Sequence, residues 1–163
     1  MPSETNVRSH LVKLLRGEGA HMSLAEAVED FPMSSINTVI PNGSYTPWQL
    51  LEHIRLAQHD ILDFMSNPDY EEPEWPAGYW PASGTQATPE EWEQTLSDIS
   101  DDNQELQKLA EDPGFDLDET IDWGDGQTRF REFLIVADHN AYHTGEFAIL
   151  RQVMGTWPAG REG

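Results

Sequence analysis

Residues 138–158, DHNAYHTGEFAILRQVMGTWP, decide how the rest of the sequence is interpreted, because they predict a helix with two histidines on one face. His139 and His143 are four residues apart, so their side chains leave such a helix about 40° apart. Gly155 suits the C-cap of this helix, and Pro158 follows it. The two imidazoles can share a metal ion, or they can be a surface or core pair without a ligand. A third partner elsewhere in the chain would favour the metal.

The length and composition place limits on the protein. A chain of 163 residues can bury about two thirds of its unfolded surface, so we expect one domain over residues 1–163. The absence of cysteine excludes disulfides, thiolate metal ligands and a cysteine nucleophile. The first residues, MPSETNVRSH, lack a basic region followed by an apolar stretch, and no run reaches the roughly 18 apolar residues of a membrane span. We therefore expect a cytoplasmic protein with no membrane partner.

The charge is strongly negative. The chain has 30 acidic residues against 9 Lys and Arg, a net charge of −21. Such a protein repels phosphate backbones, so we expect no nucleic-acid partner. Fourteen of the acids lie within residues 90–125, together with a single lysine, Lys108. This acidic segment is either an ordinary solvated face or an adaptation to a salt-rich cytoplasm, and composition does not separate the two.

Apolar residues at helical spacing predict four long helices, near residues 5–16, from Thr46, from Thr88, and over about 129–154. Both threonines are typical N-caps and are followed by proline, and a short helical piece follows Ser23. The expected apolar stripes are Val7, Leu11, Leu14 and Leu15; Leu50, Ile54, Ala57, Ile61 and Phe64; Trp92, Leu96, Ile99, Leu106 and Leu109; and Phe130, Phe133, Leu134, Ala137, Ala141, Ala148 and Val153. No strand competes, so the sequence predicts an all-α, four-helix bundle with long connections.

The connections contain aromatic residues that are unusual for disordered segments. Residues 67–87 are rich in Pro and Gly but include Tyr70, Tyr79, Trp75 and Trp80, which indicates a packed segment. Trp75 and Trp80, like Trp123 in the following connection, can line a pocket or pack in the core.

The helix that begins after Thr46 offers the third partner for the histidine pair. His53 lies three residues after Leu50, on or beside the apolar stripe, whereas His59 is expected to face solvent. Three neutral imidazoles from two facing helices can hold a divalent ion and leave a coordination position open, as catalytic metals require. His10 and His21 have no second histidine at helical spacing, and we interpret them as surface residues.

The ordered set of these motifs resembles the DinB-like family. It consists of TPWQLLEHIRLAQHDIL (46–62), ADHNAYHTGEFAILRQVMGTWP (137–158) and, near the start, LLRGEGAH (14–21). The resemblance implies a four-helix bundle with unusual connectivity, a metal held by His53, His139 and His143, and homodimers.

One position departs from the family pattern. The residue three after the second histidine of the pair is often Gln in this family, and here it is Glu146. Glu146 lies seven residues after His139, on the same helix face. It can be a hydrogen-bond acceptor that fixes an imidazole tautomer, a fourth ligand, or a surface acid. We treat it as the candidate catalytic residue.

Family members of known activity use bacillithiol or mycothiol, or isomerise maleylpyruvate. The resemblance therefore implies a metal-dependent enzyme, first of all a thiol-dependent S-transferase that acts on electrophilic small molecules. The metal lowers the pKa of an external thiol. Zn, Ni and Fe all suit imidazole ligands. Two alternatives are a metal-dependent hydrolase, with Glu146 or Asp60 as base, and a non-catalytic, stress-related binding protein. For Asp60 we favour an exposed acid without a catalytic role.

Overall fold

The computed structural model describes residues 3–160, and in this part of the chain it is helical without a strand. The helices are α1 (Glu4–Leu15), α2 (Leu24–Val28), the short 3-10 helix η1 (Met33–Ser35), α3 (Pro47–Ser66), α4 (Pro89–Glu111) and α5 (Arg129–Met154). The all-α prediction is confirmed. No helix among the described residues is long and apolar enough to cross a membrane.

The helix that carries His53 begins where the sequence predicts. The side chain of Thr46 accepts a hydrogen bond from the backbone N–H of Gln49, while the Gln49 side chain accepts from the Thr46 backbone. Pro47 occupies the first turn, where no backbone donor is needed. Loss of such a cap typically costs about 1 kcal/mol. The cap therefore fixes the start of α3 and places His53 on its second turn.

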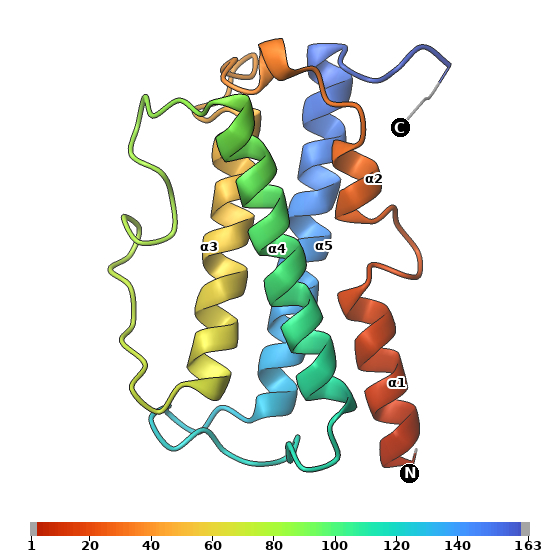
Figure 1. Ribbon diagram of the computed structural model, residues 1–163, viewed down its shortest axis with the longest axis vertical. Helices are drawn as coiled ribbons and strands as arrows, with labels where there is room; N and C mark the ends of the chain where they lie inside the picture. Colours follow the sequence, from red (N-terminus) through yellow and green to blue (C-terminus); the bar gives the residue numbers. More distant parts are fainter. Residues whose placement is uncertain (1–2, 161–163) are drawn as a thin grey trace.

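The four long helices form a closed ring. Helix α3 packs against α4 and α5, and α1 packs against the same two helices, while α2 contacts α5. The chain after α3 runs back along the length of the molecule before α4 begins, so α3 and α4 run in the same direction, opposite to α1 and α5 (Figure 1). Helices α1 and α2 follow one another along one side of the molecule (Figure 1).

Two apolar clusters fill the ring. The first joins α2 to the amino-terminal halves of α3 and α4, and its Phe31 stacks on Trp92 with ring centroids 5.2 Å apart. The second joins α1 to the other halves of α3 and α4, around Met65 and Leu106, neither of which is exposed. The division corresponds to the break between α1 and α2.

The arginine and tryptophan of the carboxy-terminal motif hold the end of α5 to α2. Arg151 is fully buried, and its Nη1 donates to the carbonyls of Ala27 (2.8 Å) and Glu29 (2.7 Å). Its guanidinium carbon lies 4.1 Å from the centre of the Trp157 ring. Gly155 ends the helix in the left-handed region, with φ 64°. The motif that contributes to the family resemblance is therefore structural at this end of the chain.

Three residues predicted to face inward do not. Leu14 is 50% exposed, Leu134 41% and Val153 56%. Leu14 lies at the gap between α1 and α2. Helix α5 carries apolar residues on nearly every face, so its sequence pattern does not indicate which face is buried.

Candidate metal centre

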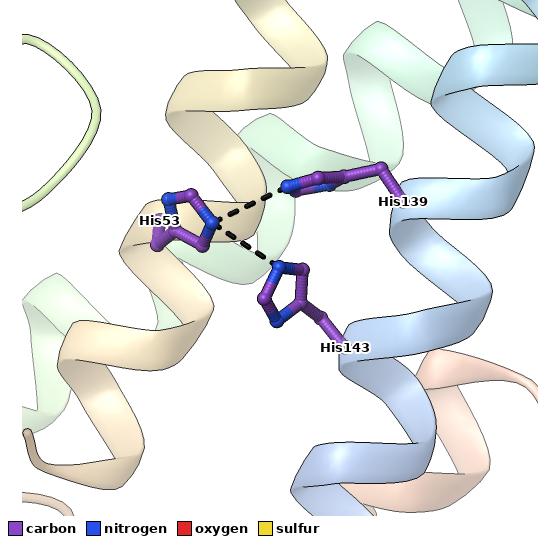
Figure 2. Close-up of side chains that lie close together, drawn as sticks. All are labelled: His53, His139 and His143. Atoms are coloured by element: carbon purple, nitrogen blue, oxygen red, sulfur yellow. Dashed lines mark hydrogen bonds between the residues drawn. The ribbon is translucent and has the colours of Figure 1, made fainter. Parts of the chain in front are cut away.

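Three histidines from two helices meet between α3 and α5. His53 comes from α3, and His139 and His143 come from adjacent turns of α5 (Figure 2). The Nε2 atom of His53 lies 3.2 Å from the Nε2 atoms of both other histidines. One ligand nitrogen from each ring lies within 4.8 Å of the others. Nitrogens bound to one tetrahedral ion at about 2.0–2.1 Å lie about 3.3 Å apart, so this spacing fits a shared ion.

The outer nitrogens of two rings fix their tautomers. Nδ1 of His53 lies 2.7 Å from the carbonyl oxygen of Tyr79, which can only accept a hydrogen bond. Nδ1 of His143 lies 2.7 Å from Oε2 of Glu146. Each Nδ1 therefore donates, and each neutral ring is left with a lone pair on Nε2. Two lone pairs face one another at 3.2 Å, an arrangement that a cation between them would stabilise.

Burial favours the neutral form of two of the imidazoles, those of His53 and His139. Desolvation lowers the pKa of His53, an effect that the Tyr79 carbonyl partly offsets. Desolvation also lowers the pKa of His139 to about 4, with further lowering from the neighbouring His143 and His53 rings. Neutral imidazole is the form that binds metal. At neutral pH both rings are therefore ready to act as ligands without first losing a proton.

His139 has weaker support than the other two rings. Its Nδ1 is buried without a partner at normal hydrogen-bond geometry, and so is Oδ1 of Asn140. Asn140 nevertheless interacts with His139 and raises its pKa slightly against the effect of burial. The Asn140 amide donates to Oε1 of the fully buried Gln58 (2.7 Å), which in turn donates to the Ile99 carbonyl (2.7 Å). A polar chain thus runs from beside His139 to α4.

Glu146 bridges a candidate ligand and a tyrosine. Its Oε2 accepts from His143, and its Oε1 accepts from the hydroxyl of Tyr45. Burial and this hydrogen bond raise the pKa of Tyr45, which keeps the hydroxyl protonated as a donor. Of the three roles considered for Glu146, the contacts correspond to an acceptor that fixes the His143 tautomer. Tyr45 was not predicted as a site residue, because it precedes the N-cap of α3 in an irregular connection without periodicity.

The segment between α3 and α4 packs directly on the site. Trp80 stacks on the His53 ring, with centroids 4.0 Å apart and planes 6° from parallel. Trp80 also packs against the first apolar cluster, so it supports a candidate ligand from the edge of the core. Trp75 is 70% exposed, and Trp123 is 37% exposed and donates to the Phe64 carbonyl, so neither of them is a core residue.

Asp60 does not fit the expectation of an exposed acid. It is half-buried, and its two oxygens accept hydrogen bonds from the hydroxyls of Tyr70 (2.8 Å) and Tyr79 (2.9 Å). Burial, reinforced by Asp60, raises the pKa of Tyr79 to about 12. The periodicity of α3 did not reveal this role, because both tyrosines come from the segment that follows. Asp60 thus anchors the segment whose Tyr79 carbonyl orients His53.

The remaining histidines lie apart from the centre. His59 faces solvent as predicted and lies 3.0 Å from a carboxylate oxygen of Asp102. His10 and His21 are also exposed, which confirms their interpretation as surface residues.

Comparison with known proteins agrees with the resemblance seen in the sequence. The model of a family described as the DinB superfamily matches residues 17–147, which include α3, α4 and all three clustered histidines. Neither the curated proteins nor the solved structures include a match to this chain.

The lowered pKa of His139 predicts a specific acid response of the metal-free protein. His139 binds a proton near pH 6.5 in the unfolded chain and near pH 4 in the folded chain. The contribution of the neutral His139 ring to the free energy of unfolding is therefore fully present above pH 6.5 and is lost as the pH falls toward 4. With a chelator present, the wild type should lose about 2 kcal/mol more than His139→Gln between pH 7.5 and 4.5. Urea unfolding at both pH values measures this difference.

The control for this measurement is His59→Gln, which alters an exposed histidine. It should follow the wild type. Identical acid losses in the wild type and His139→Gln would show that the His139 ring is not desolvated.

Proposed function

Because this chain belongs to the DinB superfamily and its three clustered histidines could hold a metal ion, we propose that it is a metal-dependent enzyme. The observation that carries the proposal is the pair of Nε2 lone pairs of His53 and His143, which face one another at 3.2 Å. His139 adds a third nitrogen within the same cluster. A set of three imidazoles leaves one coordination position for water or substrate.

The reaction that we propose is the transfer of an external thiol to an electrophilic small molecule. A divalent ion, with Zn, Ni and Fe as candidates, supplies a Lewis acid that lowers the pKa of the thiol. The chain has no cysteine of its own, so the thiol has to be a cosubstrate. His139 is less completely buried than His53 and His143, which supports access from its side of the cluster.

Within this proposal, Glu146 orients the candidate ligand His143 and accepts a proton, and Tyr45 orients Glu146. Glu146 accepts a hydrogen bond from the Nδ1–H group of His143 and thereby keeps the Nε2 lone pair directed at the metal position. We propose that Glu146 also accepts the proton that the thiol loses. Tyr45 donates to the second oxygen of Glu146 and so limits its rotation.

The first test concerns the ligands. Replacing His53, His139 or His143 with Ala should remove most of the bound metal, because two imidazoles hold a divalent ion far more weakly than three. The measurement is elemental analysis of protein purified without chelator. His59→Ala, an exposed histidine on the same helix as His53, is the matched control and should retain the metal. Full occupancy in His53→Ala would contradict the three-histidine site.

The second test concerns the reaction. Metal-loaded protein should transfer bacillithiol or mycothiol to 1-chloro-2,4-dinitrobenzene, and Glu146→Gln should lower kcat by about 10–100-fold with metal content unchanged. Tyr45→Phe, which keeps the carboxylate, should lose less. Thiol-independent hydrolysis of p-nitrophenyl acetate that requires metal would favour the hydrolase. Metal binding without either activity would favour a non-catalytic binding protein.

A second copy of this chain is the partner that we propose for the outer face of α5. Ile135, Tyr142 and Ile149 are spaced seven residues apart on α5 and are 38%, 69% and 61% exposed. This spacing puts them on one stripe. The helix has three arginines and three acids and is therefore neutral, whereas the whole chain carries −21. The stripe also carries the exposed Arg131 and Asp138, whose charges are opposite. A mainly apolar face without net charge on a polyanion suits contact with its own copy.

This proposal predicts that Ile149→Asp shifts the protein from dimer to monomer in analytical ultracentrifugation. Val39→Asp is the matched control, since Val39 is 57% exposed but lies in the connection before α3. Association of the wild type should strengthen between low and high salt, because screening reduces repulsion between two chains of charge −21. A wild type that is monomeric at high salt would contradict the proposed dimer.

A further inference from the structure

A cavity separate from the histidines opens in the gap between α1 and α2. It has a volume of about 430 Å³, within the range of small-molecule sites. Residues 14–17, 21, 23–25 and 28 form one side, and α4 forms another. On α5 the cavity is lined by Ala137, Asn140, Ala141 and Thr144. None of the three clustered histidines lines it, and the cavity lies on a different face of α5 from His139 and His143.

The lining of this cavity contains no acidic residue. This is unusual in a chain in which 30 of 163 residues are Asp or Glu. A cation would therefore find no counter-charge in the cavity. Anions are also disfavoured, because the protein carries a net charge of −21. The lining thus suits an uncharged molecule.

The guanidinium at the edge of the cavity does not alter this conclusion. Arg16 donates to Oε1 of Gln107 at 2.7 Å. Carboxylate oxygens of Glu18 and Glu111 each lie 3.9 Å from its terminal nitrogens. The charge of Arg16 is therefore already compensated by two acids that lie outside the lining.

The accessible lining of the cavity is mainly apolar. Its larger buried or partly buried apolar side chains come from three helices: Leu15 of α1, Leu24 and Val28 of α2, and Leu96 and Ile99 of α4. Polar side chains also line the cavity, among them Gln58 and Asn140, whose carboxamides are hydrogen-bonded to each other at 2.7 Å. Oδ1 of Asn140 is buried, so it does not offer an acceptor to a ligand. A ligand with an uncharged, mainly apolar body complements this lining.

We propose that this cavity is a binding site for a small, uncharged, mainly apolar molecule. The apolar body lies against the side chains of α2 and α4. The site is separate from the three clustered histidines, and the proposal does not rest on the reaction proposed for them.

The test uses three probes with the same chain and different charges: 1-octanol, octanoate and octylammonium. Octanol should bind saturably to the wild type and shift the side-chain amide signals of Gln58 and Asn140 in ¹H–¹⁵N spectra. Octanoate should bind at least tenfold more weakly. Octylammonium should associate only with the acidic surface, without shifting these amide signals.

Variants separate the cavity from the rest of the surface. Ala141→Phe fills the cavity and should weaken octanol binding at least tenfold, whereas Gly145→Ala, one turn along α5 with open space around its added methyl, should not. If Ala141→Phe does not fold, Leu96→Trp fills the same cavity from α4 and should weaken octanol binding to the same extent. His53→Ala should bind octanol like the wild type. Unsaturable binding, unmoved Gln58 and Asn140 amides, or loss of binding in His53→Ala would each overturn the proposal.

Discussion

The candidate metal site depends on one contact between α3 and α5, where the Nε2 atoms of His53 and His143 face one another at 3.2 Å. Both rings donate outward through Nδ1, so in the neutral rings the lone pairs of the inner nitrogens face each other. Such an arrangement is unfavourable in a buried site unless a cation satisfies it. The three histidines could therefore hold a metal ion.

Much of the remaining chain keeps these rings in place. The Tyr79 carbonyl and the stacked Trp80 fix His53, and Asp60 holds Tyr79 through its hydroxyl. The long segment between α3 and α4 thus has a structural reason for its aromatic content. On α5, Glu146 fixes the second ring through a hydrogen bond to His143. The orientation of both His53 and His143 therefore depends on groups outside the cluster, as is usual for the ligands of metal sites.

The sequence predicted the parts of the site that follow from helical geometry. His139 and His143 share a face because of their spacing, and His53 lies three residues after the buried Leu50 on a helix whose start is fixed by Thr46. The contacts made by irregular segments could not be predicted. A backbone carbonyl carries no sequence signature, and the hydroxyl of Tyr45 reaches Glu146 across 101 residues of chain. The same limit explains Asp60, whose partners are set by the path of residues 67–87.

Helix α5 also shows why its exposed apolar residues could not be assigned from periodicity. One face presents His139 and His143 to α3, and a second lines the cavity with Ala137 and Ala141. A third face carries the stripe that includes Ile149, exposed to solvent in the single chain. A helix that serves three apolar surroundings has no polar face to orient it. Its even distribution of apolar residues follows from these three surroundings, and its zero net charge follows from three arginines that balance Glu132, Asp138 and Glu146.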